Sequence, residues 1–462
     1  MTKKKPWEPN GYLSQWLRSI YEQKNDIPGL VAAVARDGKI IFLEAHGYAD
    51  LEKKEKMTTE HIFRIASHSK TFTATAIMQM QEQGKLRIDD YVVDYLPWLK
   101  EHKDKRFLKV TIRQLLSHGA GVTRDGLNQN YWSLQAPFPN ETRLKKDILE
   151  AELVLDNNTK MKYSNYGYSL LGIVIEAISG KSYNQYVTDH IIKPLSLKNT
   201  KPEISEGNIK RLVTGYSRVD RNKKRLPIKQ INTWAMSPAT GFCSTAEDLC
   251  KYFFAHIIGS GKLLDDESKK EMQRTQWKVE NVDERAEYGL GLEVDYINDR
   301  KLLGHGGGFP GHITKSLFDP KDKYVIVVLT NALRSGAARI AFSIARTIDY
   351  AQSNEDLVKE SLLKYAGRYE GLWSGTDFVP IGNKLLSIGA DSWEPFQQPD
   401  ELEHISGHKF KITKTNSFGS EGETVEFKMD RSGNVEHVIY AGEKLLPEKK
   451  YRSEMSKKKV IG

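Results

Sequence analysis

Ser67 and Lys70 form the first pair of residues whose types and spacing could do chemistry. Side chains three positions apart on a helix lie on the same face, so the hydroxyl and the amine can meet. A serine hydroxyl is a weak nucleophile at neutral pH, and an adjacent amine can take its proton only when that amine is uncharged. Burial lowers the pKa of a lysine because it disfavours the ammonium. The pair alone is a weak motif, since a capping serine followed by a surface lysine has the same spacing.

Tyr163 and Asn165 form a second pair, at the start of a helix that we predict over residues 166–180. A tyrosine hydroxyl held near a lysine ammonium ionises more readily and can act as a general acid or base. The amide of Asn165 could bind both Lys70 and a substrate carbonyl. Alone, Tyr163 is more often a core aromatic residue whose hydroxyl is satisfied.

A third segment places His305 before Gly306, Gly307 and Gly308, between two predicted strands. Consecutive glycines let another backbone approach the edge of a sheet closely. An edge strand with free N–H groups can bind an extended substrate and donate to an oxyanion. The alternative is a glycine-rich loop with a surface histidine. A phosphate-binding loop is excluded, because no Gly-Lys-Ser/Thr follows and no helix is predicted to start there.

The elements that must position these residues indicate an α+β domain. The segment 71–80 is rich in small and apolar residues, and Gly84 closes it, so we predict a buried helix after Ser67. Two short apolar runs joined by Asp37-Gly38 predict a hairpin, and strands are predicted again at 288–295 and from 302 to 330. Helices lie between, so both ends of the region complete one sheet.

Three further segments are predicted from pattern. Residues 12–21 form an amphipathic helix, and residues 119–142 form a long loop of the kind that often binds ligands or acts as a lid. Ser244 and Glu247 have the spacing of a capping box at the start of another helix. From about Leu362, short strands separated by turn residues indicate an all-β sandwich or barrel. We therefore predict two domains, 1–355 and 356–462.

Composition restricts the class of protein. The chain has 462 residues, 39% of them hydrophobic and 28% charged, which is typical of soluble globular proteins. No run approaches the length of a membrane span, so no transmembrane segment is expected. The two cysteines, Cys243 and Cys250, exclude a disulfide framework, and without nearby ligands we expect no metal and no cofactor.

The net charge of +9 is partly carried by lysines near both ends, at 3–5 and 457–459. No basic helix with interleaved aromatic residues is present in the sequence, so no nucleic-acid partner is expected. The basic start is followed by Pro6 where a secretory leader would be apolar, so we expect no signal peptide and a cytoplasmic location.

The three chemical segments together resemble the serine β-lactamase and penicillin-binding protein family, in its class C-like branch with D-aminopeptidases and esterases. The matching positions, in order, are Ser67-x-x-Lys70, Leu115-Leu-Ser-His118, Tyr163-x-Asn165, the segment 241–249 and His305-x-Gly307. The resemblance spans about residues 10–355 and implies an antiparallel sheet flanked by helices. The segment that opens Tyr365-Ala-Gly-Arg-Tyr369 resembles the lipocalin-like β-domain appended to some members, which implies a C-terminal all-β barrel.

The resemblance also implies roles. Ser67 attacks a carbonyl and forms an acyl-enzyme, while Lys70 and Tyr163 share the proton transfers. Asn165 orients the substrate, and His305 lines the pocket. The N–H groups of Ser67 and Gly308 form the oxyanion hole, with Gly307 in the same substrate-binding segment. The expected substrate is a small molecule or a peptide, and a homo-oligomer is left open.

His305 departs from the family pattern, because the family's carboxypeptidases place a lysine there, near the substrate carboxylate. A histidine is only partly charged at neutral pH. We therefore hypothesise that the site does not demand a C-terminal carboxylate, which leaves D-aminopeptidase, amidase or esterase activity open. Two alternatives remain: a broad-specificity esterase or β-lactamase that uses the same residues, and a catalytically idle peptide-binding or scaffold protein.

Overall fold

The computed structural model describes residues 9–23, 27–279, 286–353, 358–415 and 420–457. The basic segments at 3–5 and 458–459, and most of the segment considered for a leader, lie outside these residues. Two compact units are formed: a sheet unit, Asp26–Ala341, and a barrel unit that combines Met1–Asn25 with Phe342–Gly462. A domain is a part that folds by itself, so the division into domains 1–355 and 356–462 stays a prediction.

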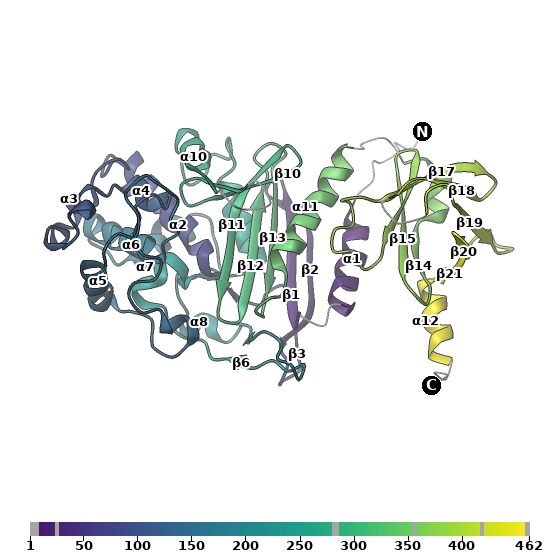
Figure 1. The fold of residues 1–462 in the computed structure, drawn as a ribbon, viewed down its shortest axis with the longest axis horizontal. Coiled ribbons are helices and arrows are strands. Elements are labelled where there is room, and N and C mark those ends of the chain that lie inside the picture. The colour runs from purple at the N-terminus through teal and green to yellow at the C-terminus, as the bar shows by residue number, and fades with distance from the viewer. Residues whose placement is uncertain (1–8, 24–26, 280–285, 354–357, 416–419, 458–462) are drawn as a thin grey trace. The chain divides into compact units, whose positions relative to one another are not determined.

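The sheet unit is built on one antiparallel sheet of nine strands, in the order β3-β2-β1-β13-β12-β11-β10-β9-β8 (Figure 1). Strands from both ends of the unit meet at β1 and β13, which pair from Leu30 with Thr330 to Arg36 with Tyr324. This arrangement confirms the predicted sheet completed by both ends of the region. The strands are β1 (Gly29–Arg36), β2 (Lys39–Asp50), β3 (Glu55–Lys56), β8 (Trp277–Val279), β9 (Ala286–Tyr288), β10 (Glu293–Ile297), β11 (Arg300–Phe309), β12 (His312–Phe318) and β13 (Tyr324–Thr330).

The turn between β1 and β2 is the predicted Asp37-Gly38 hairpin. Its two residues have φ values of 49° and 76°, both in the left-handed region that a two-residue turn of this type requires. Every residue of β13 is buried, which explains why its sequence is a continuous apolar run rather than an alternating one.

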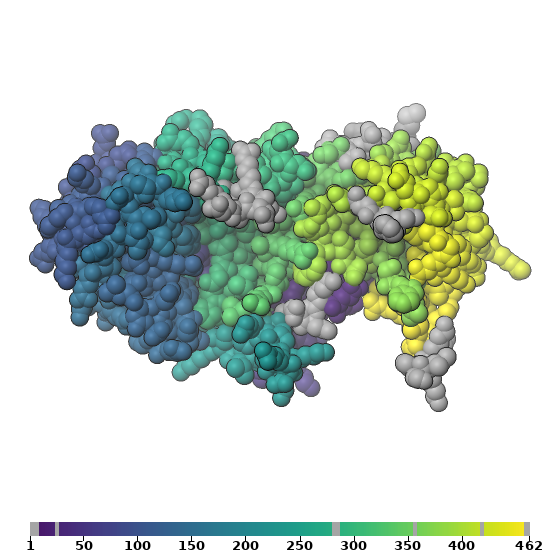
Figure 2. Space-filling model, viewed as in Figure 1, coloured from purple at the N-terminus to yellow at the C-terminus, as the bar shows by residue number. Residues whose placement is uncertain are grey.

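A helical layer follows the first strands in the chain and lies to one side of the sheet, where Figure 1 labels α2 to α7. The space-filling view shows the early part of this layer as one continuous blue region (Figure 2). Helix α9 packs against β1, β12 and β13 and so joins the layer to the sheet. The helices are α2 (Ser69–Glu82), α3 (Val92–Tyr95), α4 (Ile112–Leu116), α5 (Glu141–Glu150), α6 (Asn165–Ser179), α7 (Tyr183–Val187), α8 (Glu206–Ile209), α9 (Ala246–Ala255) and α10 (Asp266–Gln273).

Short helical turns and two small ladders connect these helices. The ladders pair β4 (Phe63–Arg64) with β7 (Cys243–Ser244) and β5 (Gly215–Tyr216) with β6 (Pro227–Ile228). The turns are η1 (Ala66–His68), η2 (Pro97–Glu101), η3 (Lys105–Lys109), η4 (Asn130–Ser133), η5 (Thr188–Ile192), η6 (Trp234–Met236) and η7 (Ser237–Gly241).

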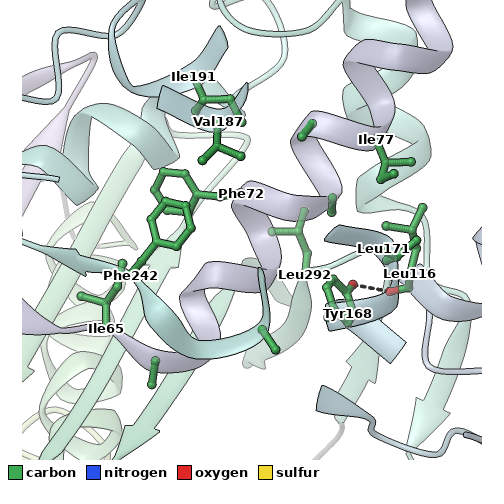
Figure 3. Packing of buried hydrophobic residues seen from close by; sticks show 14 of the residues in the cluster. Ile65, Phe72, Ile77, Leu116, Tyr168, Leu171, Val187, Ile191, Phe242 and Leu292 are labelled. Atoms are coloured by element: carbon green, nitrogen blue, oxygen red, sulfur yellow. Dashed lines mark hydrogen bonds between the residues drawn. The ribbon is translucent and has the colours of Figure 1, made fainter. Parts of the chain in front are cut away.

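Helix α2 is the buried helix that the sequence predicts, and every residue from Ser69 to Met80 is buried. Phe72 stacks on Phe242 with ring centroids 4.4 Å apart, and Val187 lies beside this pair in Figure 3. The hydroxyl groups that the helix buries are hydrogen-bonded, so their burial leaves none of them without a partner. Thr73, for example, donates to the carbonyl oxygen of Pro238 at 2.7 Å.

The cap of α9 differs from the prediction by one residue. Thr245, not Ser244, is the N-cap, and its side chain accepts the N–H of Asp248. Ser244 belongs to β7, where it pairs with Phe63, so the extended strand delays the start of the helix. The cap of α4 is a full capping box between Thr111 and Gln114.

The barrel unit contains a closed barrel of eight antiparallel strands, which confirms the predicted C-terminal all-β barrel (Figure 1). Its interior is filled by aromatic and aliphatic side chains from alternate strand positions, such as Phe410 and Ile412. The strands are β14 (Gly367–Glu370), β15 (Gly375–Ile381), β16 (Lys384–Gly389), β17 (Asp400–Ser406), β18 (Lys409–Lys414), β19 (Thr424–Met429), β20 (Val435–Tyr440) and β21 (Glu443–Pro447).

Four helices accompany the barrel sequence: α1 (Asn10–Gln23), α11 (Ala337–Ser353), η8 (Glu360–Tyr365) and α12 (Glu448–Lys457). Helix α1 is the predicted amphipathic helix, and it buries Leu13, Trp16, Leu17 and Ile20. The indole N–H of Trp16 donates to the carbonyl oxygen of Ser392 at 2.8 Å. In the described ranges, no helix combines the length and apolar character that crossing a membrane requires.

Candidate active site

Ser67 lies in the tight turn η1, immediately before α2. The preceding residue, Ala66, has a φ of 48°, a left-handed conformation that costs a non-glycine residue about 1–2 kcal/mol. Ser69 holds the turn, because its hydroxyl donates to the carbonyl oxygen of Ala66 at 2.6 Å and accepts the N–H of Phe242 at 3.1 Å. Strain of this kind is found where neighbouring structure fixes a functional residue in place.

The amine of Lys70 is fully buried and has three polar neighbours. Its Nζ atom lies 3.1 Å from Oγ of Ser67, 2.7 Å from Oδ1 of Asn165 and 2.8 Å from the carbonyl oxygen of Ala239. Burial lowers the pKa of Lys70 to about 7, and the carboxylate of Asp125 acts in the opposite direction. In a large fraction of the protein molecules, this amine is therefore uncharged at neutral pH.

The hydroxyl of Tyr163 lies on the other side of the serine, 2.9 Å from Oγ of Ser67. The ring is also close to Lys70, whose Nζ atom lies 4.8 Å from the ring centroid. Burial nevertheless raises the pKa of Tyr163 above its ordinary value, and this outweighs the hydrogen bond that Tyr163 donates to Ser67. The expectation that the nearby lysine eases ionisation is therefore wrong, since the phenol stays neutral and is a proton donor.

Asn165 is the first residue of α6, which begins there because Ser164 caps it by accepting the N–H of Gly167 at 2.8 Å. Its Oδ1 atom faces Lys70, and its Nδ2 atom donates to Oδ1 of Asp125 at 2.7 Å. A carboxylate can only accept, so Asp125 determines which end of the amide faces the lysine.

Asp125 comes from the long loop that the sequence predicts as a binding loop or lid. Its side chain is buried and accepts the indole N–H of Trp132 at 2.9 Å. Phe138, farther along the loop, stacks on Phe309 of β11 with ring centroids 5.9 Å apart. These contacts anchor the loop beside the site, with one of its carboxylates directly behind Asn165.

Strand β11 packs against η1, and Gly307 is the residue that makes this approach possible. A Cβ atom at Gly307 would lie 2.3 Å from the carbonyl oxygen of Ile65 and 2.3 Å from Oγ1 of Thr314. Gly308 is less confined, since a Cβ atom there would meet only Cδ1 of Ile313, at 3.7 Å. The sequence predicts a close backbone approach at the three consecutive glycines, and of these Gly307 is the one at which η1 and β11 leave no room for a side chain.

His305 is only 1% exposed, and both of its ring nitrogens have partners. Nδ1 lies 2.6 Å from the carbonyl oxygen of Gly306, and Nε2 lies 3.2 Å from the hydroxyl of Tyr288. Burial lowers the pKa of His305 more than the carboxylate of Glu293 raises it, which favours the neutral ring. A carbonyl oxygen can only accept, so the proton of that ring lies on Nδ1 and Nε2 is left to accept from the phenol. The side chain supports the wall of the site rather than presenting a charge to it.

Two residues that sequence reasoning did not single out as functional also contact the predicted site residues. His118 packs its ring 4.3 Å from that of Tyr163, and its Nδ1 accepts the N–H of Ser164 at 3.1 Å. Glu293 of β10 has Oε1 3.4 Å from Nδ1 of His305. The Leu-Leu-Ser-His segment was a signal for His118, whereas the sequence carries no pattern that pairs Glu293 with this strand. Among the residues described, no group of three or more His, Cys, Asp or Glu could hold a metal ion.

Comparison with known proteins identifies similar sequences and similar folds. The family model described as "Beta-lactamase" matches residues 17–347. "Protein flp" of Staphylococcus aureus (strain MW2) is 29% identical over 311 residues, which cover 67% of this chain and 60% of that protein. The chain thus spans less than two thirds of the length of this relative.

Two solved structures share the fold. A D-stereospecific amidohydrolase from Streptomyces sp. has a TM-score of 0.62 and 24% identity, and the match covers 71% of this chain and 97% of that one. An octameric penicillin-binding protein homologue from Pyrococcus abyssi has a TM-score of 0.65 and 22% identity, over 94% of this chain and 99% of that one. Because the family model matches most of its length, this chain belongs to the β-lactamase family.

Proposed function

We propose that this protein is a serine hydrolase that cleaves amide or ester bonds through an acyl-enzyme on Ser67. The observation that carries the proposal is the position of Oγ of Ser67 between two proton carriers, 3.1 Å from Nζ of Lys70 and 2.9 Å from the hydroxyl of Tyr163. A nucleophile with a base on one side and an acid on the other has the arrangement that acyl transfer needs.

The partners of Lys70 favour its role as the base. An uncharged amine has two N–H groups and one lone pair. Asn165 Oδ1 and the carbonyl oxygen of Ala239 are acceptors only, so they take both N–H groups. The lone pair is then left for the hydroxyl proton of Ser67, which is the direction of proton transfer that activates the nucleophile.

In the proposed reaction, the proton of Ser67 moves to Nζ of Lys70 as Oγ bonds to the carbonyl carbon. The N–H groups of Ser67 and Gly308 stabilise the oxyanion. Removal of one such donor typically lowers the rate by about a hundred- to a thousandfold. The neutral phenol of Tyr163 gives its proton to the leaving nitrogen or oxygen, the bond to that atom breaks, and the Lys70 ammonium returns a proton to the phenol. Water then attacks the ester on Ser67 by the reverse path and releases the acid.

The substrate class that we propose is a peptide, D-amino-acid or β-lactam type amide, or an ester. Support comes from the D-stereospecific amidohydrolase of the same fold and from the family itself. The neutral, buried His305 supports the hypothesis that a C-terminal carboxylate is not required. We assign Asn165 to substrate orientation and His305, Gly307 and Gly308 to the strand wall of the site.

The test is labelling with a fluorophosphonate probe, which reacts only with an activated serine. The wild-type protein is expected to gain the mass of one adduct, mapped to the peptide that contains Ser67, and Ser67→Ala to gain none. Fragmentation of the labelled peptide should place the adduct on Ser67 and not on Ser69, whose hydroxyl holds the turn through Ala66 and Phe242. A protein that stays unlabelled while correctly folded would support the catalytically idle alternative instead.

A further inference from the structure

A carboxylate occupies the edge of the strand that borders the proposed nucleophile. Glu293 accepts the N–H of Gly306 through Oε2 at 2.9 Å, and its Oε1 lies 3.4 Å from Nδ1 of His305. The Glu293 side chain is half-buried, with 31% of its surface exposed, so solvent can reach it, unlike the buried His305 beside it. The N–H of Gly306, a donor that could otherwise serve a substrate anion, is therefore already taken by an acidic side chain.

The charge on Glu293 is maintained by its neighbour Lys315. Burial acts to raise the pKa of Glu293, but the ammonium of Lys315, at 2.8 Å, outweighs it and holds the pKa at about 2. The same ammonium lies 2.7 Å from Asp295 and is only 5% exposed, so two carboxylates already share it. His305 adds no positive charge, because it is neutral. Among the described residues of β10, β11 and β12, this part of the wall offers a substrate the negative charge of Glu293 and no unpaired cation. The exposed guanidinium of Arg124, 5.6 Å from the ring centroid of Tyr163, is paired with Asp125 at 3.2 Å.

Glu293 lies on the side of the site where the leaving group would depart. Tyr163, the proposed donor to that group, packs on His118, and His118 packs on Tyr288 with ring centroids 4.9 Å apart. The hydroxyl of Tyr288 contacts His305, which contacts Glu293. Glu293 also adds to burial in raising the pKa of Tyr163, as expected of a charge close to the phenol. A leaving group that takes its proton from Tyr163 would therefore depart within the electrostatic field of Glu293.

We propose that Glu293 determines leaving-group specificity: it selects amides and esters whose leaving group carries an ammonium or no charge, and it rejects those whose leaving group carries a carboxylate. This inference rests on the proposed acyl-enzyme function of Ser67. It narrows that function, because β-lactams and the peptides that carboxypeptidases cleave both place a carboxylate on the departing side. Amides and esters with a cationic or neutral departing group remain as the substrate class.

The test compares three esters of one acyl group. Their leaving alcohols are choline, its neutral isostere with carbon in place of nitrogen, and a hydroxy acid of similar length. In the wild type, kcat/KM should decrease in that order. Glu293→Gln keeps an oxygen for the N–H of Gly306 but removes the charge, and it should lower the choline-to-carboxylate ratio of kcat/KM by about tenfold or more.

Asp295→Asn is the matched control. It removes one carboxylate from the same ammonium but has no contact with His305 or Gly306 among the bonds described. In this variant, the choline-to-carboxylate ratio of kcat/KM should change by less than about threefold. Should Glu293→Gln fail to fold, the wild-type ratio measured at low and high salt still tests the proposal, because screening should reduce it.

The inference is overturned if Glu293→Gln leaves the ratio unchanged, if Asp295→Asn changes it equally, or if the wild type prefers the carboxylate ester. Failure of the underlying function is a different result. It would be seen as no acyl-enzyme mass on Ser67 with any of the three esters, and that would overturn both proposals.

Discussion

Asp125 accepts a hydrogen bond from Nδ2 of Asn165 at 2.7 Å, and this bond orients the amide so that its oxygen faces Lys70. With the amide reversed, its N–H groups would face the amine and compete with Ser67 for the lone pair of Lys70. Asp125 thus acts on the base through Asn165, and it is a positioning residue in the proposed mechanism.

Replacing Asp125 with asparagine should change both the rate and its pH dependence. The new side chain can offer an N–H as well as an oxygen, so Asn165 loses its fixed orientation and kcat/KM should fall roughly ten- to a hundredfold. The negative charge of Asp125 raises the pKa of Lys70 against the larger effect of burial. Its removal should therefore lower that pKa and move the acid limb of the kcat/KM profile to lower pH.

Trp132→Phe is the control for this prediction, because the indole donates to the same oxygen of Asp125 but has no hydrogen bond to Asn165 among those described. It should leave the acid limb where the wild type has it. A slower Asp125→Asn enzyme whose acid limb does not move would show that the residue only supports the loop.

Tyr163→Phe should lower kcat by about a hundred- to ten-thousandfold on amide substrates, because the proposed general acid is lost. The loss should be much smaller on a nitrophenyl ester, whose leaving group departs without a proton. Tyr168→Phe, on helix α6 five residues farther along the chain, is a matched control: its hydroxyl donates to the carbonyl oxygen of Leu116 and has no hydrogen bond to Ser67 in the described structure. Equal losses on both substrates would argue against a proton-donor role for Tyr163.

Gly307→Ala should destabilise the fold, because the new Cβ atom would lie 2.3 Å from the backbone oxygen of Ile65. We expect the free energy of unfolding to fall by about 1–3 kcal/mol in urea titrations. Gly308→Ala, with its nearest neighbour at 3.7 Å, should change it by less than about 0.5 kcal/mol. Similar values for the two variants would mean that β11 does not press on the turn that carries Ser67.

The sequence predicts those parts of the fold and the site that depend on local rules. The hairpin at Asp37-Gly38 follows from turn chemistry, and the pairing of Ser67 with Lys70 follows from helical spacing. The cap of α9 was predicted one residue early because Ser244 and Thr245 are both good caps, and only the strand pairing of Ser244 with Phe63 decides between them.

Other features of the site depend on tertiary contacts that leave no local pattern. Asp125 precedes Asn165 by 40 residues along the chain. Lys70 and Ala239, whose carbonyl oxygen accepts from the lysine, are 169 residues apart. The ionisation of Tyr163 was misjudged for a related reason. The sequence indicates a lysine near the phenol, but only the fold shows that the phenol is buried and that burial raises its pKa more than the hydrogen bond to Ser67 and the charge of Arg124 lower it.

The central claim is that an uncharged Lys70 takes the proton of Ser67, and the pH dependence of fluorophosphonate labelling tests it directly. The second-order rate constant for labelling Ser67 should rise about tenfold per pH unit below the pKa of Lys70 and level off above it. With the pKa of Lys70 at about 7, the curve should bend near neutral pH. Lys70→Met should react slowly and without this inflection. A wild-type rate that is flat through neutral pH, or that rises only near the ordinary pKa of lysine, would contradict the account.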